Sequence, residues 1–120
     1  MVWIRIAHES QLKERTTLKF SFMREGVKIE AFLVKFDGKV AAYENVCRHI
    51  PISIDYADNR FFTQDQRHLI CQTHGAIYEP STGKCIRGPC TGASLYSLDV
   101  VAKDGELWLR SLERKGVDSH

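Results

Sequence analysis

The sequence contains no long run of apolar residues. No stretch of its 120 residues approaches the roughly 18 consecutive apolar residues that a membrane-spanning helix requires. Residues 1–5 also lack the basic segment and long apolar stretch that mark a secretory leader. We therefore expect a soluble protein of the cytoplasm that has no membrane partner.

An excess of charge of one sign is also absent. Seventeen Lys and Arg residues stand against fifteen Asp and Glu residues, which gives a net charge of +2. The basic residues do not form a run, and proteins that bind nucleic acid or anionic membranes usually carry a basic run or patch. The composition therefore predicts neither kind of partner.

Helical periodicity is missing as well, because no stretch keeps apolar residues at helical spacing for more than a turn or two. The length of 120 residues suits one domain with its own core. We predict an all-β fold with a single domain over residues 1–112 and a polar tail over residues 113–120.

Alternating apolar and polar residues predict several short strands. Asp37-Gly38 and Asp104-Gly105 each stand between two such segments, and Asp-Gly favours tight hairpin turns because both residues tolerate positive φ. A polar connection is expected over residues 8–17, and no element is assigned to residues 52–65. Strands are predicted at residues 3–7, 27–36, 40–46, 67–70, 76–79, 95–102 and 106–110.

Cysteine occurs only four times, and two of these residues have a histidine close behind them. Cys47-Arg48-His49 and Cys71-Gln72-Thr73-His74 each combine a thiolate with an imidazole, which suits a metal site clamped between two loops. Tetrahedral zinc with two Cys and two His fits this set. A two-iron, two-sulfide cluster, with both Cys on one iron and both His on the other, fits it equally.

The order of the ligand residues favours the cluster. Zinc sites of the finger type usually show a Cys pair followed by a His pair, whereas here each segment supplies one of each. Cys-x-His, then Cys-x-x-His-Gly, Thr82-Gly83 and Gly88-Pro89 resemble the Rieske iron–sulfur proteins. The resemblance extends over residues 34–110, which is most of the chain.

This resemblance implies one [2Fe-2S] cluster per chain as the cofactor. Cys47 and Cys71 would hold the inner iron, and His49 and His74 the outer iron near the surface. The implied fold is an antiparallel β-sandwich or barrel of stacked small sheets. Its cluster-binding subdomain would consist of hairpin loops within residues 46–91.

Two other segments follow from the same resemblance. Gly88-Pro89 would form a third loop that covers the cluster. Residues 50–70, between the two ligand pairs, are more numerous than is usual in the family. We therefore predict a short insertion within residues 52–66.

The implied function is that of a soluble Rieske ferredoxin, an electron carrier with no catalytic residues of its own. It would take single electrons from a reductase and deliver them, through transient contacts, to an oxygenase or another terminal oxidoreductase. Two alternatives remain: a small Rieske subunit of a larger oxidoreductase of the nitrite-reductase kind, and a Cys/His zinc module for interactions. The predicted exit route for electrons runs through the two histidines, in a patch with Arg48, Ile50, Pro51, Gln72, Gly88 and Pro89.

The second ligand segment carries information about the reduction potential. Respiratory relatives of high potential have Ser and Tyr at the positions of Ala76 and Tyr78, and a disulfide between the ligand loops that this sequence cannot form. The pattern is typical of the ferredoxin-like branch of lower potential. Tyr78 is expected either to donate a hydrogen bond to the cluster or to fill the core beneath the loop.

Cys85 and Cys90 flank the predicted third loop and are not part of the ligand set. Three interpretations are open: buried free thiols, a disulfide that ties the loop, or a redox or alternative-ligand role. His8, His68 and His120 lack a partner at ligand spacing, so we expect them to be surface residues without a metal.

Overall fold

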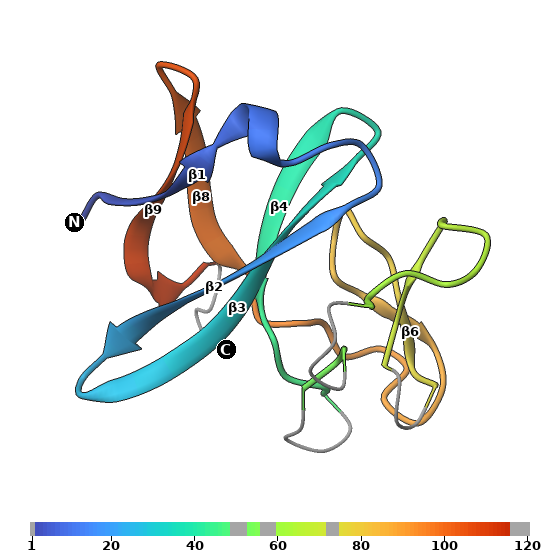
Figure 1. Cartoon of the computed structure of the whole chain (residues 1–120). Coiled ribbons are helices and arrows are strands. Elements are labelled where there is room, and N and C mark those ends of the chain that lie inside the picture. Colours follow the sequence, from blue (N-terminus) through green and yellow to red (C-terminus); the bar gives the residue numbers. More distant parts are fainter. Residues whose placement is uncertain (1, 49–52, 56–59, 72–74, 116–120) are drawn as a thin grey trace.

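The computed structural model describes residues 2–48, 53–55, 60–71 and 75–115 of the chain. Within these ranges the chain forms nine strands and one 3-10 turn (Figure 1). The turn is Glu9–Gln11. The strands are β1 (Ile4–His8), β2 (Thr17–Arg24), β3 (Val27–Phe36), β4 (Lys39–Glu44), β5 (Leu69–Ile70), β6 (Ile77–Tyr78), β7 (Cys85–Arg87), β8 (Leu98–Lys103) and β9 (Glu106–Arg114).

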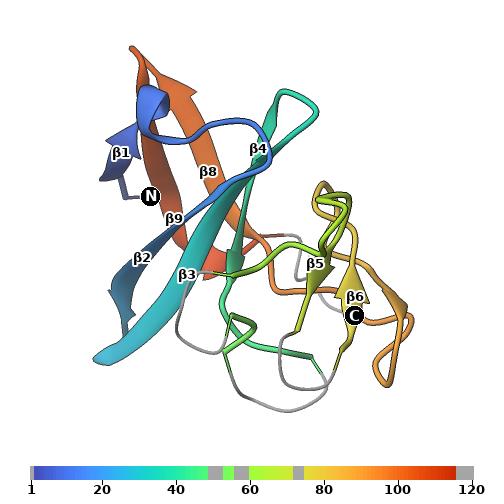
Figure 2. The ribbon, with the colours of Figure 1, turned by 45° about the vertical axis from the view of Figure 1, so that its right-hand side comes forward.

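The strands form three antiparallel sheets of three strands each in the part of the chain that the structure describes. Their orders are β1-β9-β8, β2-β3-β4 and β5-β6-β7. Figure 2 shows the β2-β3-β4 sheet between the other two. The predicted all-β architecture of stacked small sheets is confirmed.

The middle sheet separates two hydrophobic cores. Phe32 and Val34 of β3 belong to the core that also contains Cys47. Ala31 and Leu33, which point to the opposite face because side chains alternate along a strand, pack into the second core. The middle of β3, residues 31–34, is therefore buried on both faces, as its continuous apolar run predicts.

The turn signals of the sequence are confirmed at both predicted hairpins. Asp37-Gly38 connects β3 to β4 with φ values of 53° and 75°. Asp104-Gly105 connects β8 to β9 with φ values of 55° and 79°. Positive φ at both central residues is the geometry that twisted antiparallel strands favour.

Strand β2 was not predicted. Its register with β3 runs without a break from Thr17 opposite Val34 to Arg24 opposite Val27. Leu18, Phe20 and Phe22 lie in or against the second core. The alternation of these residues with polar ones is a local signal of a strand.

The C-terminal strand is longer than predicted. β9 continues to Arg114, so Glu113 and Arg114 belong to a strand and not to the predicted tail. The Lys115 amide also donates a hydrogen bond to the Ser97 carbonyl at 2.7 Å. Contacts with residues distant in sequence therefore hold this end of the chain in place.

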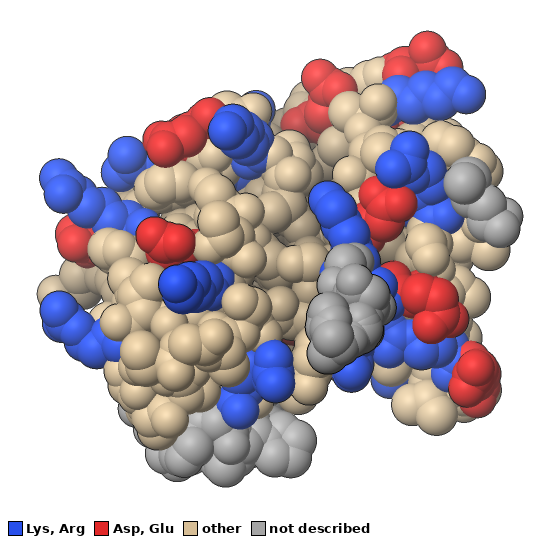
Figure 3. Space-filling view, turned by 180° about the vertical axis from the view of Figure 1, so that it is seen from behind, with Lys and Arg blue, Asp and Glu red and all other residues tan. Residues whose placement is uncertain are grey.

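Lys and Arg are interspersed with Asp and Glu on the face shown in Figure 3. This distribution agrees with the small net charge of the sequence. Within the described ranges, no helix has the length and apolar character needed to span a membrane.

Candidate metal centre

The first predicted ligand segment begins where the chain leaves the middle sheet. Cys47 lies three residues beyond the end of β4 and is 3% exposed. The prediction that Cys47 lies at the tip of a hairpin is wrong. β4 pairs with β3, and the next strand, β5, belongs to another sheet. The strands before and after Cys47 therefore belong to different sheets.

Cys71, the first residue of the second predicted ligand segment, does lie within a hairpin, between the paired strands β5 and β6. Cys71 follows β5, and its amide donates to the Ala76 carbonyl at 2.8 Å. The Gly75 amide donates back to the Cys71 carbonyl at 2.8 Å, and Gly75 has a φ of 75°. Cys71 is fully buried and lies in the same core as Cys47. The fold thus brings both predicted sulfur ligands into one buried environment.

His49 and His74 lie outside the described residues, as do three members of the predicted surface patch, Ile50, Pro51 and Gln72. Among the residues that are described, no group of three or more His, Cys, Asp or Glu side chains is arranged to hold a metal ion. The complete four-residue ligand set therefore stays a prediction.

Tyr78 places its hydroxyl oxygen at the centre of a group of polar atoms. The oxygen lies 3.5 Å from Cys47 Sγ and 3.2 Å from Cys90 Sγ, and it accepts a hydrogen bond from the Arg48 amide at 3.0 Å. The side chain is fully buried. Burial, together with the hydrogen bonds to the two sulfurs, raises the pKa of Tyr78 far above its usual value, so the hydroxyl keeps its proton. Tyr78 therefore fills the core and also contacts a predicted ligand sulfur.

The Tyr78→Phe substitution should lower the reduction potential of the cluster by an amount on the order of tens of millivolts. A hydrogen bond to a ligand sulfur stabilises the more negative, reduced state. For a one-electron couple, about 59 mV corresponds to a tenfold change in the equilibrium constant. Potentiometry followed by electron paramagnetic resonance measures the shift.

Tyr43→Phe is the matched control for this experiment. Tyr43 lies in the same core, but its hydroxyl donates to the Pro80 carbonyl at 2.8 Å. The control should leave the potential unchanged. An equal shift in both variants would show that Tyr78 acts only through packing.

The predicted third loop packs on Ala76, two residues after the second predicted ligand segment. Gly88 has a φ of 103°, and a Cβ atom at this position would lie 2.9 Å from the Ala76 Cα. A glycine is therefore needed here both for the backbone conformation and for the close approach. Gly88 and Pro89 are exposed.

The two remaining cysteines lie on either side of this turn. Cys85 is the first residue of β7 and pairs with Tyr78 of β6. Cys90 follows Pro89 and is partly exposed. Cys85 and Cys90 are free thiols in the structure.

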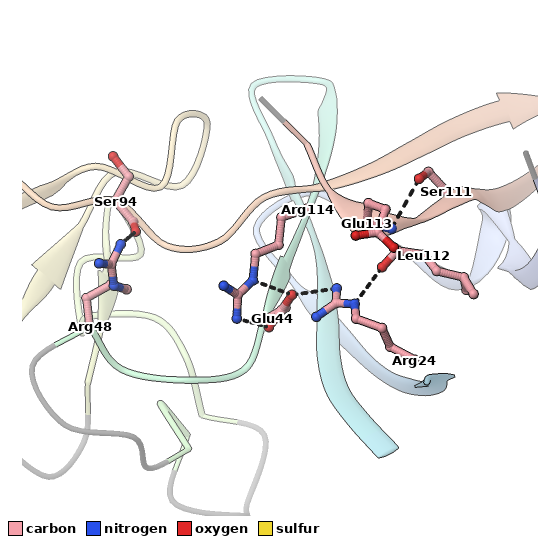
Figure 4. A network of polar contacts seen from close by, with 8 residues as sticks. All are labelled: Arg24, Glu44, Arg48, Ser94, Ser111, Leu112, Glu113 and Arg114. Atoms are coloured by element: carbon pink, nitrogen blue, oxygen red, sulfur yellow. Dashed lines mark hydrogen bonds and ion pairs between the residues drawn. The ribbon is translucent and has the colours of Figure 1, made fainter. Parts of the chain in front are cut away.

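Arg48 connects the first predicted ligand segment to residues that lie far along the sequence. Its guanidinium donates to the Ser94 carbonyl at 2.6 Å (Figure 4) and lies 4.3 Å from the centroid of the Tyr96 ring. Arg114 lies 3.6 Å from the same centroid. The sequence had suggested only a surface role for Arg48, because its partners are more than 40 residues away.

The predicted insertion is attached to the middle sheet. Asn45 accepts a hydrogen bond from the Ile54 amide at 2.9 Å and donates one to the Asp55 carboxylate at 3.1 Å. Phe61 stacks on Phe32 with ring centroids 4.2 Å apart. Phe61 therefore lies in the core that also contains Cys47.

The model of the Rieske [2Fe-2S] domain matches residues 2–110, and the chain therefore belongs to this family. Membership of this family confirms the predicted cofactor, a [2Fe-2S] cluster. No curated protein matches the chain.

Solved structures of ferredoxins and oxygenases share this fold. The ferredoxin of carbazole 1,9a-dioxygenase from Nocardioides aromaticivorans IC177 has a TM-score of 0.67 and 22% identity, over 91% of this chain and 97% of that one. The Sphingomonas yanoikuyae B1 ferredoxin has a TM-score of 0.66 and 19% identity, over 90% and 97%. A component of 2-oxoquinoline 8-monooxygenase has a TM-score of 0.73 and 18% identity, over 94% of this chain and 26% of that one.

The described residues fit a [2Fe-2S] cluster. Two buried cysteines share one core, a protonated phenol contacts one of their sulfurs, and Gly88 lets the neighbouring turn approach the second ligand segment. When bound, the cluster would accept and release a single electron. The surrounding core excludes water from the two cysteine sulfurs, and the protonated Tyr78 hydroxyl lies 3.5 Å from Cys47 Sγ.

Proposed function

We propose that this chain is a Rieske ferredoxin, which accepts one electron from a reductase and passes it to an oxygenase or another terminal oxidoreductase. The proposal includes no bond change in a substrate and no catalytic residue. The observation that carries it is the placement of Cys47 and Cys71 in one buried core with the Tyr78 hydroxyl against a sulfur. The similarity to two ferredoxin chains, each covered over 97% of its length, supports the carrier role.

The proposal assigns four residues to the cluster. Cys47 and Cys71 hold the inner iron, and His49 and His74 hold the outer iron. The cluster-binding loops lie within residues 46–91 of one Rieske domain, which we now extend from residue 112 to Arg114 because β9 ends there. We place the protein in the cytoplasm, where reducing conditions keep cysteines available as thiolates.

The partners in this proposal bind transiently. Structures that combine a ferredoxin with the oxygenase of carbazole 1,9a-dioxygenase are among those similar to this chain, with a TM-score of 0.70 over 92% of one matched chain. Small, brief contacts are usual for redox partners because the electron carrier must dissociate after each transfer. By analogy, a reductase and an oxygenase would use the same exposed edge of the cluster in turn.

The proposed function is tested by purifying the native protein from its own cells without oxygen, followed by gel filtration and coulometric titration. We expect a reddish-brown protein that elutes without a large subunit. It should take up one electron per cluster and return that electron to cytochrome c. A colourless zinc protein, or one that elutes only with a large oxidoreductase subunit, would contradict the proposal.

A further inference from the structure

Cys85 and Cys90 are connected to a predicted ligand by a chain of close polar contacts. Cys90 Sγ lies 3.1 Å from Cys85 Sγ and 3.2 Å from the Tyr78 hydroxyl oxygen. That oxygen lies 3.5 Å from Cys47 Sγ. The Tyr78 hydroxyl therefore links two thiols outside the predicted ligand set to a sulfur within that set.

We propose that Cys85 and Cys90 form a site of oxidative modification: a dithiol that a small-molecule disulfide converts to an intramolecular disulfide, which changes the hydrogen bonding of Tyr78 to Cys47. The proposal rests on the proposed function, because it assigns Cys47 to the cluster. It adds two residues and a class of reagent that the electron-carrier role does not require.

The backbone holds the two cysteines across a tight turn. The Cys85 amide donates to the Ala93 carbonyl at 2.8 Å, and the Gly92 amide donates to the Cys85 carbonyl at 3.1 Å. The Ala93 amide donates to the Cys90 carbonyl at 2.9 Å. A disulfide has its sulfurs about 2.05 Å apart, so bond formation requires the two sulfurs to approach by only about 1 Å.

The two thiols differ in solvent exposure, and this difference suits them to different steps. Cys85 is fully buried, whereas Cys90 is partly exposed, so a reagent from solvent meets Cys90 first. Burial raises the pKa of Cys85 to about 11, and its hydrogen bond with Cys90 adds to this effect. Since the thiolate is the attacking form, Cys85 is suited to a second, intramolecular step.

The reaction proceeds as two thiol–disulfide exchanges. In the first, the Cys90 thiolate attacks the small disulfide RSSR, forms a mixed disulfide and releases one RS⁻. In the second, the Cys85 thiolate attacks Cys90 Sγ in that mixed disulfide and releases the other RS⁻. The two cysteines lose two electrons and two protons in total, and RSSR is reduced to two RSH.

This reaction alters the hydrogen bonding of Tyr78. The hydroxyl has one proton to donate, and both Cys47 Sγ and Cys90 Sγ lie within reach of it. The new bond draws Cys90 Sγ toward Cys85, so Cys90 becomes a poorer hydrogen-bond acceptor for the Tyr78 hydroxyl. The hydroxyl then donates its proton to Cys47 Sγ. A hydrogen bond to a ligand sulfur favours the reduced cluster, so the disulfide form should have the higher reduction potential.

The test treats the cluster-loaded protein with oxidised glutathione in the absence of oxygen, followed by alkylation and mass spectrometry. The wild-type protein should lose two hydrogens in the peptide that contains Cys85 and Cys90, with no glutathione attached. Cys85→Ser should keep a glutathione on Cys90, because the second step is blocked. Cys90→Ser should remain unmodified at Cys85. Alkylation of both thiols in the treated wild-type protein, or a lasting glutathione adduct on it, would overturn the proposal.

The reduction potential of the same samples provides the second measurement. It should rise after glutathione treatment of the wild-type protein and should not respond in Cys90→Ser. A disulfide that forms without any change in potential would overturn the proposed link to Cys47. The cluster spectrum is recorded in parallel: its absence contradicts the proposed function, whereas an intact cluster beside unreactive thiols contradicts the dithiol proposal alone.

Discussion

Replacing Cys47 or Cys71 with serine should abolish the absorption and electron paramagnetic resonance spectra of the cluster. The iron content should fall to near zero, because thiolates bind the iron far better than hydroxyls of the same size. Metal analysis and spectroscopy of the protein purified without oxygen measure the effect.

The same substitution at Cys85 or Cys90 provides a matched control. Cys85 is buried in the same core as the two predicted ligands, and Cys90 packs against that core. A general loss of stability from a buried Cys→Ser change should therefore affect all of these variants. We expect the cluster to persist in the two controls. A Cys47→Ser or Cys71→Ser protein with normal iron content would exclude that residue from the ligand set.

Removal of the Glu44 side chain should cause a large loss of stability. Glu44 is 5% exposed, and its carboxylate accepts hydrogen bonds from Arg24 at 2.8 Å and from Arg114 at 3.0 and 3.3 Å (Figure 4). Glu44→Ala leaves two guanidinium groups without this partner. Loss of one partner from a buried ion pair typically costs about 3 kcal/mol or more, and we expect urea unfolding to show a decrease of about 3 kcal/mol.

The control for this effect is Glu106→Ala. Glu106 forms an ion pair with Arg5, but their side chains are 30% and 50% exposed. Exposed pairs contribute about 1 kcal/mol or less, so this variant should unfold close to the wild-type urea concentration. Equal losses in the two variants would show that the burial of Glu44 adds nothing.

The same carboxylate should make stability depend on pH in the acid range. Burial raises the pKa of Glu44, but hydrogen bonds from Arg114 and Arg24 outweigh this effect, and the pKa lies below its usual value. The stabilisation is therefore complete above the usual carboxyl pKa and is lost as pH falls through the lowered native pKa. Glu44→Gln should show a flatter curve of unfolding free energy below about pH 4. A curve parallel to that of the wild-type protein would contradict this contribution.

The parts of the fold that were predicted correctly are set by local chemistry. Asp37-Gly38 and Asp104-Gly105 specify their hairpins because positive φ is a property of the turn residues themselves. The length of β9 was underestimated because Arg114 is held by Glu44, a residue distant in sequence. The predicted hairpin at Cys47 was also wrong. Sequence signals for a hairpin do not show to which sheet the next strand belongs.

The ligand pairs could be predicted from spacing because Cys-x-His and Cys-x-x-His place both donors in one short segment. The contacts that adjust the site could not be identified in this way. Tyr78 meets Cys47 across 31 positions of the sequence, and Arg48 meets Ser94 across 46. The interpretation of Tyr78 as either a donor or a core residue was too narrow, because a buried ring can present its hydroxyl to a sulfur.

The identity and function of the metal centre are tested most directly by a reductive titration of the purified protein, followed by electron paramagnetic resonance. Neutral imidazoles on one iron make the cluster less negative and easier to reduce than a cluster held by four thiolates. We expect one paramagnetic species, formed by one electron, with a potential between roughly −150 and +300 mV. A potential near about −400 mV, as in plant-type ferredoxins with four cysteine ligands, or a protein that holds zinc and takes up no electron, would contradict the assignment.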